Sequence, residues 1–224
     1  MTRWLRGYYA ILDVPAAAPD QASLLDLDDL VRQAEQLLAA RPCCLQLRAK
    51  SLGAAAMRDV ALLLRNRCRA AAVPLCVNDR LDVALAVGAD VAHLGQDDLP
   101  LADARRLSGG RLILGYSTHR ADQAAAAVAG GADYLGFGPI FDTGSKLRPD
   151  PTVGLDALRA VCAATPIPVV AIGGITLATI ASVAATGAAA AAVISAVNRA
   201  PNPTEAAREV AAAFAPRDEG GARR

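Results

Sequence analysis

Residues 75–98 read LCVNDRLDVALAVGADVAHLGQDD and contain one complete strand–helix–strand unit. The apolar run 75–78 predicts a short buried strand, residues 81–87 have the apolar spacing of a short helix, and Gly88 ends that helix. Residues 91–94 form a second apolar run, which predicts the next strand. A strand followed by a helix and another strand favours parallel pairing with a right-handed crossover.

The same alternation extends along the chain in both directions. We expect strands at residues 8–13, 43–48, 75–78, 91–94, 113–117, 134–137, 169–172 and 190–194. We expect helices at 27–40, 54–71, 81–87, 103–107, 122–129, 155–163, 176–185 and 204–214, with Thr176 and Thr204 as N-caps of the last two.

Eight strand–helix units in a chain of 224 residues predict an α/β fold with a single (β/α)8 TIM barrel. We expect the barrel to occupy residues 1–215 and to be followed by a disordered tail at 216–224. A doubly wound open sheet is the alternative. The barrel is favoured because polar motifs recur directly after the strands, and a barrel brings those positions to one face.

The composition excludes several classes of protein. A formal net charge of +1 argues against a general nucleic-acid-binding protein, and only 4% of the residues are aromatic, so a base-stacking surface is not expected. The hydrophobic content of 54% is enough for a sizeable core and excludes disorder of the whole chain. We therefore expect small-molecule partners rather than nucleic acid.

The cysteines and the N-terminal sequence indicate a cytoplasmic protein without a membrane segment. Five cysteines occur without a CxxC pair or metal-ligand spacing, which is typical of buried thiols in a reducing compartment. The first residues show neither a long apolar stretch nor a secretory cleavage site. Residues 160–198 carry no charge, but prolines and glycines interrupt them, so we interpret them as buried strand, helix and strand.

Charged side chains follow the second, third and fourth expected strands. Gln46, Arg48 and Lys50 alternate along the chain, so they share a face, and two cations there suit a phosphate or diphosphate. Asp79 follows the third strand, and Asp97 and Asp98 follow the fourth. Two carboxylates beside two cations suit Mg²⁺ together with substrate phosphates. The alternative for the two cations is that they belong to a solvated strand end. The alternative for the aspartates is that they cap helices.

The later strands end in hydroxyl and glycine residues. Ser117 ends the fifth strand and His119, a candidate general base, follows it, whereas His93 in an apolar strand is expected to be a core residue. The pair Gly173-Gly174 ends strand seven and Ser195 ends strand eight, where many barrels bind phosphate through backbone N–H groups. Tight packing of the turn is the alternative. The loop after the sixth strand is expected to act as a lid.

Seven short motifs stand in order at successive strand ends. They are QLRAK (46–50), ND (78–79), HLGQDD (93–98), GYSTH (115–119), ADYLGFGPIFDTGSK (132–146), IGGI (172–175) and ISA (194–196). Together they resemble the thiamine-phosphate synthase family, also called thiamine-phosphate pyrophosphorylase, from Tyr8 to Phe214. The resemblance implies a barrel that joins a hydroxymethylpyrimidine diphosphate to a thiazole phosphate and releases pyrophosphate.

The resemblance also implies roles for individual residues. The residues implied to contact the pyrimidine diphosphate are Gln46, Arg48, Lys50, Asn78, Ser117 and Lys146. Those implied to hold the thiazole phosphate are Thr143, Ser145, Gly174, Ile194 and Ser195, and those implied to bind Mg²⁺ are Asp79 and Asp98. Departure of the diphosphate leaves a methylene cation that the thiazole nitrogen attacks. The expected catalytic residues are Arg48, Lys50, Lys146 and Ser117.

Three positions depart from the family pattern. Ala49 replaces a frequent acidic residue, Asp142 stands where proline is common, and Ser145 replaces a threonine. Asp142 adds an anion near the phosphates, which would weaken binding or alter closure of the loop.

Three other functions are weighed against this one. The closest is a thiazole tautomerase on the same barrel, with a base such as His119. Another is a catalytically inactive barrel that binds thiazole phosphate. The third is a phosphate-binding barrel of the tryptophan or histidine pathway. Such a barrel would have the same phosphate site after strands seven and eight, but that function does not account for QLRAK together with two aspartates.

Overall fold

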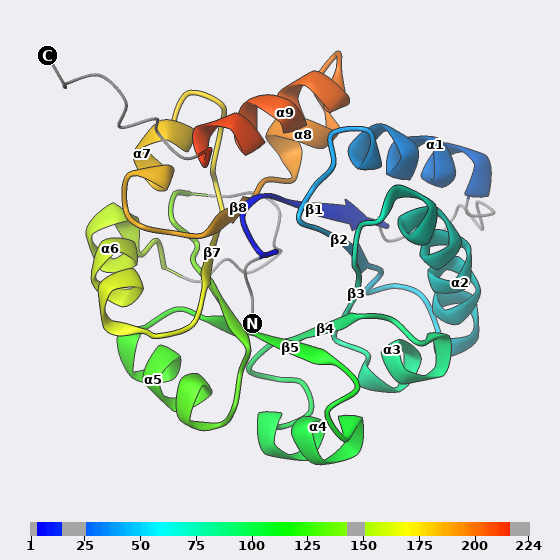
Figure 1. Cartoon of the computed structure of the whole chain (residues 1–224), viewed down its shortest axis with the longest axis horizontal. Coiled ribbons are helices and arrows are strands. Elements are labelled where there is room, and N and C mark those ends of the chain that lie inside the picture. The colour runs from blue at the N-terminus through cyan, green and yellow to red at the C-terminus, as the bar shows by residue number, and fades with distance from the viewer. Residues whose placement is uncertain (1–3, 15–25, 143–150, 216–224) are drawn as a thin grey trace, which may run out of the picture.

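The chain folds into a closed barrel of eight parallel strands surrounded by helices (Figure 1). The computed structural model describes residues 4–14, 26–142 and 151–215. The strands are β1 (Gly7–Asp13), β2 (Cys44–Arg48), β3 (Leu75–Asn78), β4 (Val91–Leu94), β5 (Ile113–Thr118), β6 (Tyr134–Phe137), β7 (Val169–Ile172) and β8 (Ala190–Ala192). Strand β1 pairs with both β2 and β8, which closes the barrel. The predicted TIM barrel is therefore confirmed, and the open sheet is excluded.

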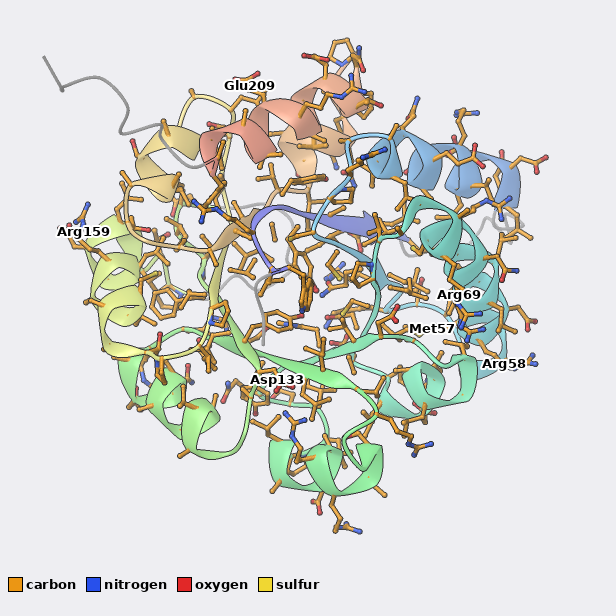
Figure 2. The ribbon with its side chains drawn as sticks, viewed as in Figure 1. Met57, Arg58, Arg69, Asp133, Arg159 and Glu209 are labelled. Atoms are coloured by element: carbon orange, nitrogen blue, oxygen red, sulfur yellow. The ribbon has the colours of Figure 1, made fainter. Side chains whose placement is uncertain are left out.

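The helices form a ring outside the strands (Figure 1). In the described residues they are α1 (Leu27–Leu38), α2 (Ala54–Ala71), α3 (Leu81–Val87), α4 (Leu101–Ser108), α5 (Ala121–Ala129), α6 (Gly154–Ala164), α7 (Ile180–Ala184), α8 (Ser195–Asn198) and α9 (Pro203–Ala213). Charged residues such as Arg58, Arg159 and Glu209 project outward from this ring (Figure 2). The helices thus turn their apolar faces to the strands and their charged faces to solvent.

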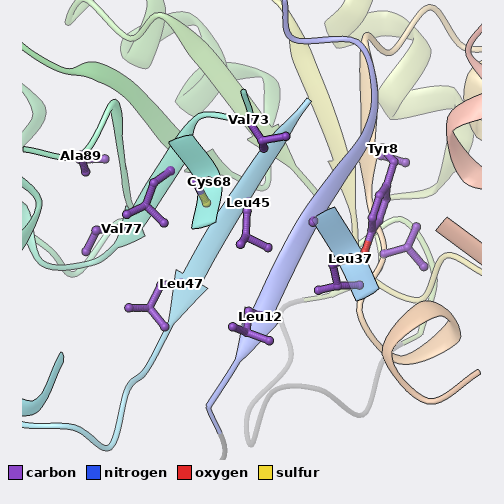
Figure 3. Close-up of a cluster of buried hydrophobic side chains, with 14 of the residues drawn as sticks. Tyr8, Leu12, Leu37, Leu45, Leu47, Cys68, Val73, Val77 and Ala89 are labelled. Atoms are coloured by element: carbon purple, nitrogen blue, oxygen red, sulfur yellow. The ribbon is translucent and has the colours of Figure 1, made fainter. Parts of the chain in front are cut away.

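Alternation along each strand divides the core into two layers. Tyr8 and Leu12 of β1 point outward and pack between the strands and helices, near Leu37 of α1 (Figure 3). Tyr9 and Ile11 point inward and pack inside the barrel with residues from the opposite strands. Because neighbouring side chains on a strand face opposite ways, one apolar strand serves both layers.

Two predicted helix starts are wrong. Helix α7 begins at Ile180 rather than after Thr176, because Thr179 Oγ1 accepts from the Thr176 amide and holds residues 176–179 in a turn. Helix α9 is capped by Asn202, whose side chain accepts from the amide of Glu205. The hydroxyl of Thr204, the predicted cap, instead donates to a carbonyl of α1 at 2.8 Å.

The uncharged stretch 160–198 contains β7, α7 and β8, as predicted. Across the described part of the chain, no helix combines the length and apolar character needed to cross a membrane. The expected tail at 216–224 lies outside the described residues.

Candidate active site

A cleft of about 810 Å³ opens at the carboxyl ends of the strands, and residues from all eight strands or the turns after them line it. Every predicted site residue that the structure describes lines this cleft: Gln46, Arg48, Lys50, Asn78, Asp79, Asp98, Ser117, Gly174, Ile194 and Ser195. Thr143, Ser145 and Lys146 lie outside the described residues. Parallel strands end at one face of a barrel, which explains why residues so far apart in sequence converge here.

The two cations at the end of β2 are each held by a carboxylate. Arg48 forms an ion pair with Asp13, the residue opposite it in the register of β1 and β2. Lys50 Nζ lies 3.2 Å from Asp79 Oδ2. Arg48 is the more enclosed of the two, with 21% of its side chain exposed, whereas 59% of the Lys50 side chain is exposed. The guanidinium is therefore positioned before any ligand arrives, while the ammonium group of Lys50 can move to an incoming anion.

Asp79 and Asp98 form a pair of carboxylates on the neighbouring ends of β3 and β4. Asp79 has left-handed backbone geometry with a φ of 65°, and its amide donates to the His93 carbonyl at 2.8 Å. Asp98 accepts from the Gly95 amide at 2.7 Å. Burial and the nearby charge of Asp79 raise the pKa of Asp98. A cation between the two carboxylates would offset both effects.

The charge balance of the cleft also favours a metal ion. The charged side chains that line it are Arg48, Lys50 and Arg199 against Asp79, Asp97, Asp98 and Asp142. Three cations against four anions leave these described residues with a formal charge of −1, which is unsuited to binding two anionic substrates. No group of three or more His, Cys, Asp or Glu side chains within residues 4–14, 26–142 and 151–215 is arranged to hold a metal. An ion here would complete its coordination with substrate and water oxygens, as Mg²⁺ commonly does.

The opposite side of the cleft is formed by glycine and backbone. Gly173 and Gly174 follow β7 with φ values of 96° and 65°. A Cβ on Gly174 would lie 2.5 Å from the Asp142 carbonyl oxygen, so the turn packs directly against the backbone after β6. Ile194 and Ser195 follow β8 and line the same region. Arg199, which the sequence analysis did not single out, adds a cation near this cup.

The inner wall of the cleft contains polar side chains that the sequence analysis missed or misjudged. His93 is buried, as predicted for a core residue, but it also lines the cleft, and its Nε2 lies 2.9 Å from Ser117 Oγ. Its Nδ1 lies 3.0 Å from the hydroxyl of Tyr134, which in turn contacts the hydroxyl of Tyr9. The alternation of side chains along β1 and β6 could have revealed Tyr9 and Tyr134, because it turns both side chains inward.

The stability of the fold is expected to depend on the protonation of His93. Burial lowers the pKa of His93 to about 4, below its usual value of 6.5. Between these values the unfolded chain binds a proton that the folded chain excludes, so stability falls as the pH drops below 6.5. We expect a loss of about 2 kcal/mol between pH 7 and pH 5 that a His93→Gln variant lacks. Urea unfolding at both pH values measures this, and equal losses in the two proteins would contradict it.

His119, the candidate general base, lines the cleft, and its Nδ1 forms a hydrogen bond with the Gly138 carbonyl. If the imidazole is neutral, this contact assigns its proton to Nδ1, because a carbonyl oxygen only accepts.

The departures from the family pattern differ in their surroundings. Ala49 is buried in the outer core layer, because it faces away from Arg48 and Lys50, so the missing acidic residue leaves the cleft unchanged. Asp142 lines the cleft, and its carboxylate accepts from the Thr152 hydroxyl at 2.6 Å. The extra anion is thus tied to a residue ten positions further along the chain.

All five cysteines are free thiols. Cys44 and Cys76 are fully buried inside the barrel, and Cys43 is half-buried. Burial raises the pKa of Cys43 to about 12, so this thiol stays protonated. These environments agree with the predicted role of small buried hydrophobic residues.

The family whose model matches the chain is thiamine monophosphate synthase, over residues 18–197. The chain belongs to this family. It is 50% identical to the thiamine-phosphate synthase of Chloroflexus aurantiacus over 75% of this chain and 77% of that protein. It is 47% identical to the thiamine-phosphate synthase of Anaeromyxobacter dehalogenans over 83% of both chains.

The fold comparison agrees with this membership. The solved structure of a thiamine phosphate pyrophosphorylase from Pyrococcus furiosus superposes with a TM-score of 0.82 at 32% identity, covering 95% of this chain and 96% of the other. The chain is therefore a transferase of the thiamine monophosphate synthase family with a TIM-barrel fold. The tautomerase and binding-only alternatives find no support in these comparisons.

Proposed function

We propose that the chain joins 4-amino-2-methyl-5-hydroxymethylpyrimidine diphosphate to 4-methyl-5-(2-phosphoethyl)thiazole, giving thiamine phosphate and pyrophosphate. One observation carries this proposal. A single cleft has two held cations and a carboxylate pair at one side and a glycine-lined cup at the other. A diphosphate suits the first region and a monophosphate the second, and the two substrates of this reaction carry those groups.

The proposed roles follow the family pattern onto the residues of the cleft. Gln46, Arg48, Lys50, Asn78, Ser117 and Lys146 contact the pyrimidine diphosphate. Thr143, Ser145, Gly174, Ile194 and Ser195 hold the thiazole phosphate. Arg48 and Lys50 reach the diphosphate from the end of β2, and the family pattern assigns Lys146 to the same diphosphate. This assignment is supported by the presence of all the described members in one cleft.

The donor set fits Mg²⁺ at Asp79 and Asp98, since both are carboxylates and the described side chains that line the cleft carry a formal charge of −1. When bound, this ion supplies Lewis-acid stabilisation of the charge that develops on the departing pyrophosphate. Asp79 and Asp98 hold it, and Lys50, which pairs with Asp79 in the structure, is then available to the diphosphate oxygens.

The reaction proposed for these residues needs no protein nucleophile. The bond between the pyrimidine methylene carbon and the diphosphate oxygen breaks, and the aminopyrimidine ring stabilises the resulting cation. The thiazole nitrogen then forms the new bond to that carbon. Arg48 and Lys50 stabilise the negative charge of the leaving group, and the two subsites hold the rings in line, so the protein acts by electrostatics and positioning. The five free thiols favour a cytoplasmic location.

Product formation by the purified protein tests this proposal. Given both substrates, the protein is expected to form thiamine phosphate and an equal amount of pyrophosphate with Mg²⁺, and to lose this activity in EDTA. Thermal stabilisation by thiazole phosphate without any product would instead support a tautomerase or a binding protein. Product formation unchanged by EDTA would contradict the metal assignment alone.

A further inference from the structure

A chain of buried polar side chains crosses the barrel interior between Gln46 and Ser117. Gln46 Nε2 donates to the Tyr9 hydroxyl at 3.0 Å, and the Tyr9 and Tyr134 hydroxyls are 2.9 Å apart. The Tyr134 hydroxyl lies 3.0 Å from His93 Nδ1, and His93 Nε2 lies 2.9 Å from Ser117 Oγ. Five side chains from five different strands thus form one continuous path, and both of its ends line the cleft.

Two glycines leave the space that this path needs. A Cβ on Gly115 would lie 2.5 Å from His93 Nδ1 and would also overlap the Tyr134 side chain. A Cβ on Gly136 would lie 3.1 Å from His93 Cε1. Both glycines have ordinary backbone angles, so their role is to admit the imidazole and the phenol rather than to form a turn. The two strands that follow β4 in the barrel, β5 and β6, are therefore shaped around the His93 ring.

The direction of the hydrogen bonds follows from the group at one end. The amide nitrogen of Gln46 only donates, so the Tyr9 oxygen accepts and its own proton is available for the Tyr134 oxygen. The Cys76 sulfur neighbours both tyrosine hydroxyls, but sulfur is a weaker acceptor than a hydroxyl oxygen or an imidazole nitrogen, so we take neither tyrosine to donate to it. Tyr134 then donates to His93 Nδ1.

A neutral imidazole that accepts at Nδ1 carries its proton on Nε2, so His93 donates to Ser117 Oγ. The hydroxyl proton of Ser117 is left for a group in the cleft. At the opposite end, no group among the described residues bonds Gln46 Oε1, so this carbonyl is also available to the cleft. One end of the path thus offers a donor and the other an acceptor.

We propose that His93 is a positioning residue that, through the path from Gln46 by way of Tyr9 and Tyr134, fixes Ser117 as a hydrogen-bond donor to the pyrimidine diphosphate. The identity of that ligand rests on the proposed function, whereas the direction of the path rests on the structure alone. Ser117 donates to an acceptor atom of the substrate, and Gln46 accepts from its amino group. Because Ser117 is fixed as a donor and Gln46 as an acceptor before the substrate binds, the site selects an aminopyrimidine over an analogue in which the amino group is replaced by a carbonyl.

The imidazole tautomer tests the direction without any substrate. The chain contains two histidines, so ¹⁵N spectra of the ring nitrogens in the unliganded protein hold two sets of signals, and a His93→Gln variant assigns them. The expected result is a neutral His93 with its proton on Nε2. A proton on Nδ1 would overturn the proposal, because Ser117 would then donate to the imidazole rather than to the substrate.

Two buried tyrosines, Tyr134 inside the barrel and Tyr8 in the outer core layer, provide matched variants for the kinetic test. Tyr134→Phe removes the hydroxyl that donates to Nδ1 and should lower kcat/KM for the pyrimidine diphosphate about tenfold. Its KM for thiazole phosphate should not change. Tyr8→Phe removes a buried hydroxyl that has no hydrogen-bond partner, and it should leave both kinetic constants unchanged.

In Tyr134→Phe, the ¹⁵N signals should also show His93 shifting toward the other tautomer. If folded Tyr134→Phe matches Tyr8→Phe in both kinetics and tautomer, the proposed path is wrong. A wild-type protein that forms no thiamine phosphate would overturn the proposed function instead, and the tautomer would still decide the direction of the path.

Discussion

Asp79→Asn and Asp98→Asn are each expected to lower kcat by about 10²–10³, because each removes half of the carboxylate pair that holds the metal ion. The change is close to isosteric. Asparagine tolerates the left-handed backbone at position 79, and at position 98 its side-chain oxygen still accepts from the Gly95 amide. The KM for thiazole phosphate should stay near the wild-type value, since the carboxylates lie away from the glycine-lined cup. Steady-state kinetics at saturating Mg²⁺ measure both constants.

Asp97→Asn is the matched control for this pair. Asp97 lines the cleft next to Asp98 and carries the same charge, but it is exposed and is not expected to bind the metal. A small change in Asp97→Asn beside a large loss in Asp98→Asn would show that the position of the charge matters. Near-normal turnover in both Asp79→Asn and Asp98→Asn would remove the basis of the metal assignment.

Gly174→Ala should raise the KM for thiazole phosphate by about 10–100-fold, equivalent to 1–3 kcal/mol of overlap and backbone strain. The new methyl group would lie 2.5 Å from the Asp142 carbonyl oxygen and 2.6 Å from the Phe141 backbone. Relief of that overlap must move the turn after β7 away from the segment after β6, which widens the phosphate cup. Initial rates measured against thiazole phosphate give the constant.

Gly109→Ala separates this overlap from simple backbone strain. Gly109 caps α4 with a φ of 56°, close to the 65° of Gly174, but a Cβ there meets no atom within 4 Å. Gly109→Ala should therefore cost about 1 kcal/mol of stability without a change in the KM for thiazole phosphate. If both variants raise that KM equally, the loss comes from general strain rather than from the cup.

The barrel could be predicted because its signals are local. Each buried strand is a short apolar run, and each run is followed by a helical pattern, as in residues 75–98. The helix starts at Thr176 and Thr204 could not be predicted, since each depended on a competing bond. The Thr179 side chain closes a turn with Thr176, and the Thr204 hydroxyl reaches a carbonyl of α1.

The cleft was predictable at its rim but not in its wall. Arg48 ends a strand, and Lys50 and Asp79 come just after strands, so the sequence places all three at the active face of a barrel. The partner of Arg48 was not predicted, because the pairing with Asp13 depends on the register between β1 and β2. The role of His93 was missed for a similar reason, since an apolar strand gives no sign that its ring meets Ser117 on the neighbouring strand β5.

The central claim is that a diphosphate binds beside Arg48 and Lys50 only together with a metal ion held by Asp79 and Asp98. Calorimetric titration of pyrophosphate into the purified protein tests this most directly, with Mg²⁺ or with EDTA, and with Asp79→Asn in parallel. We expect binding by the wild-type protein in Mg²⁺, little in EDTA, and little by Asp79→Asn in either buffer. Equal affinity of the wild-type protein in Mg²⁺ and in EDTA would contradict the claim.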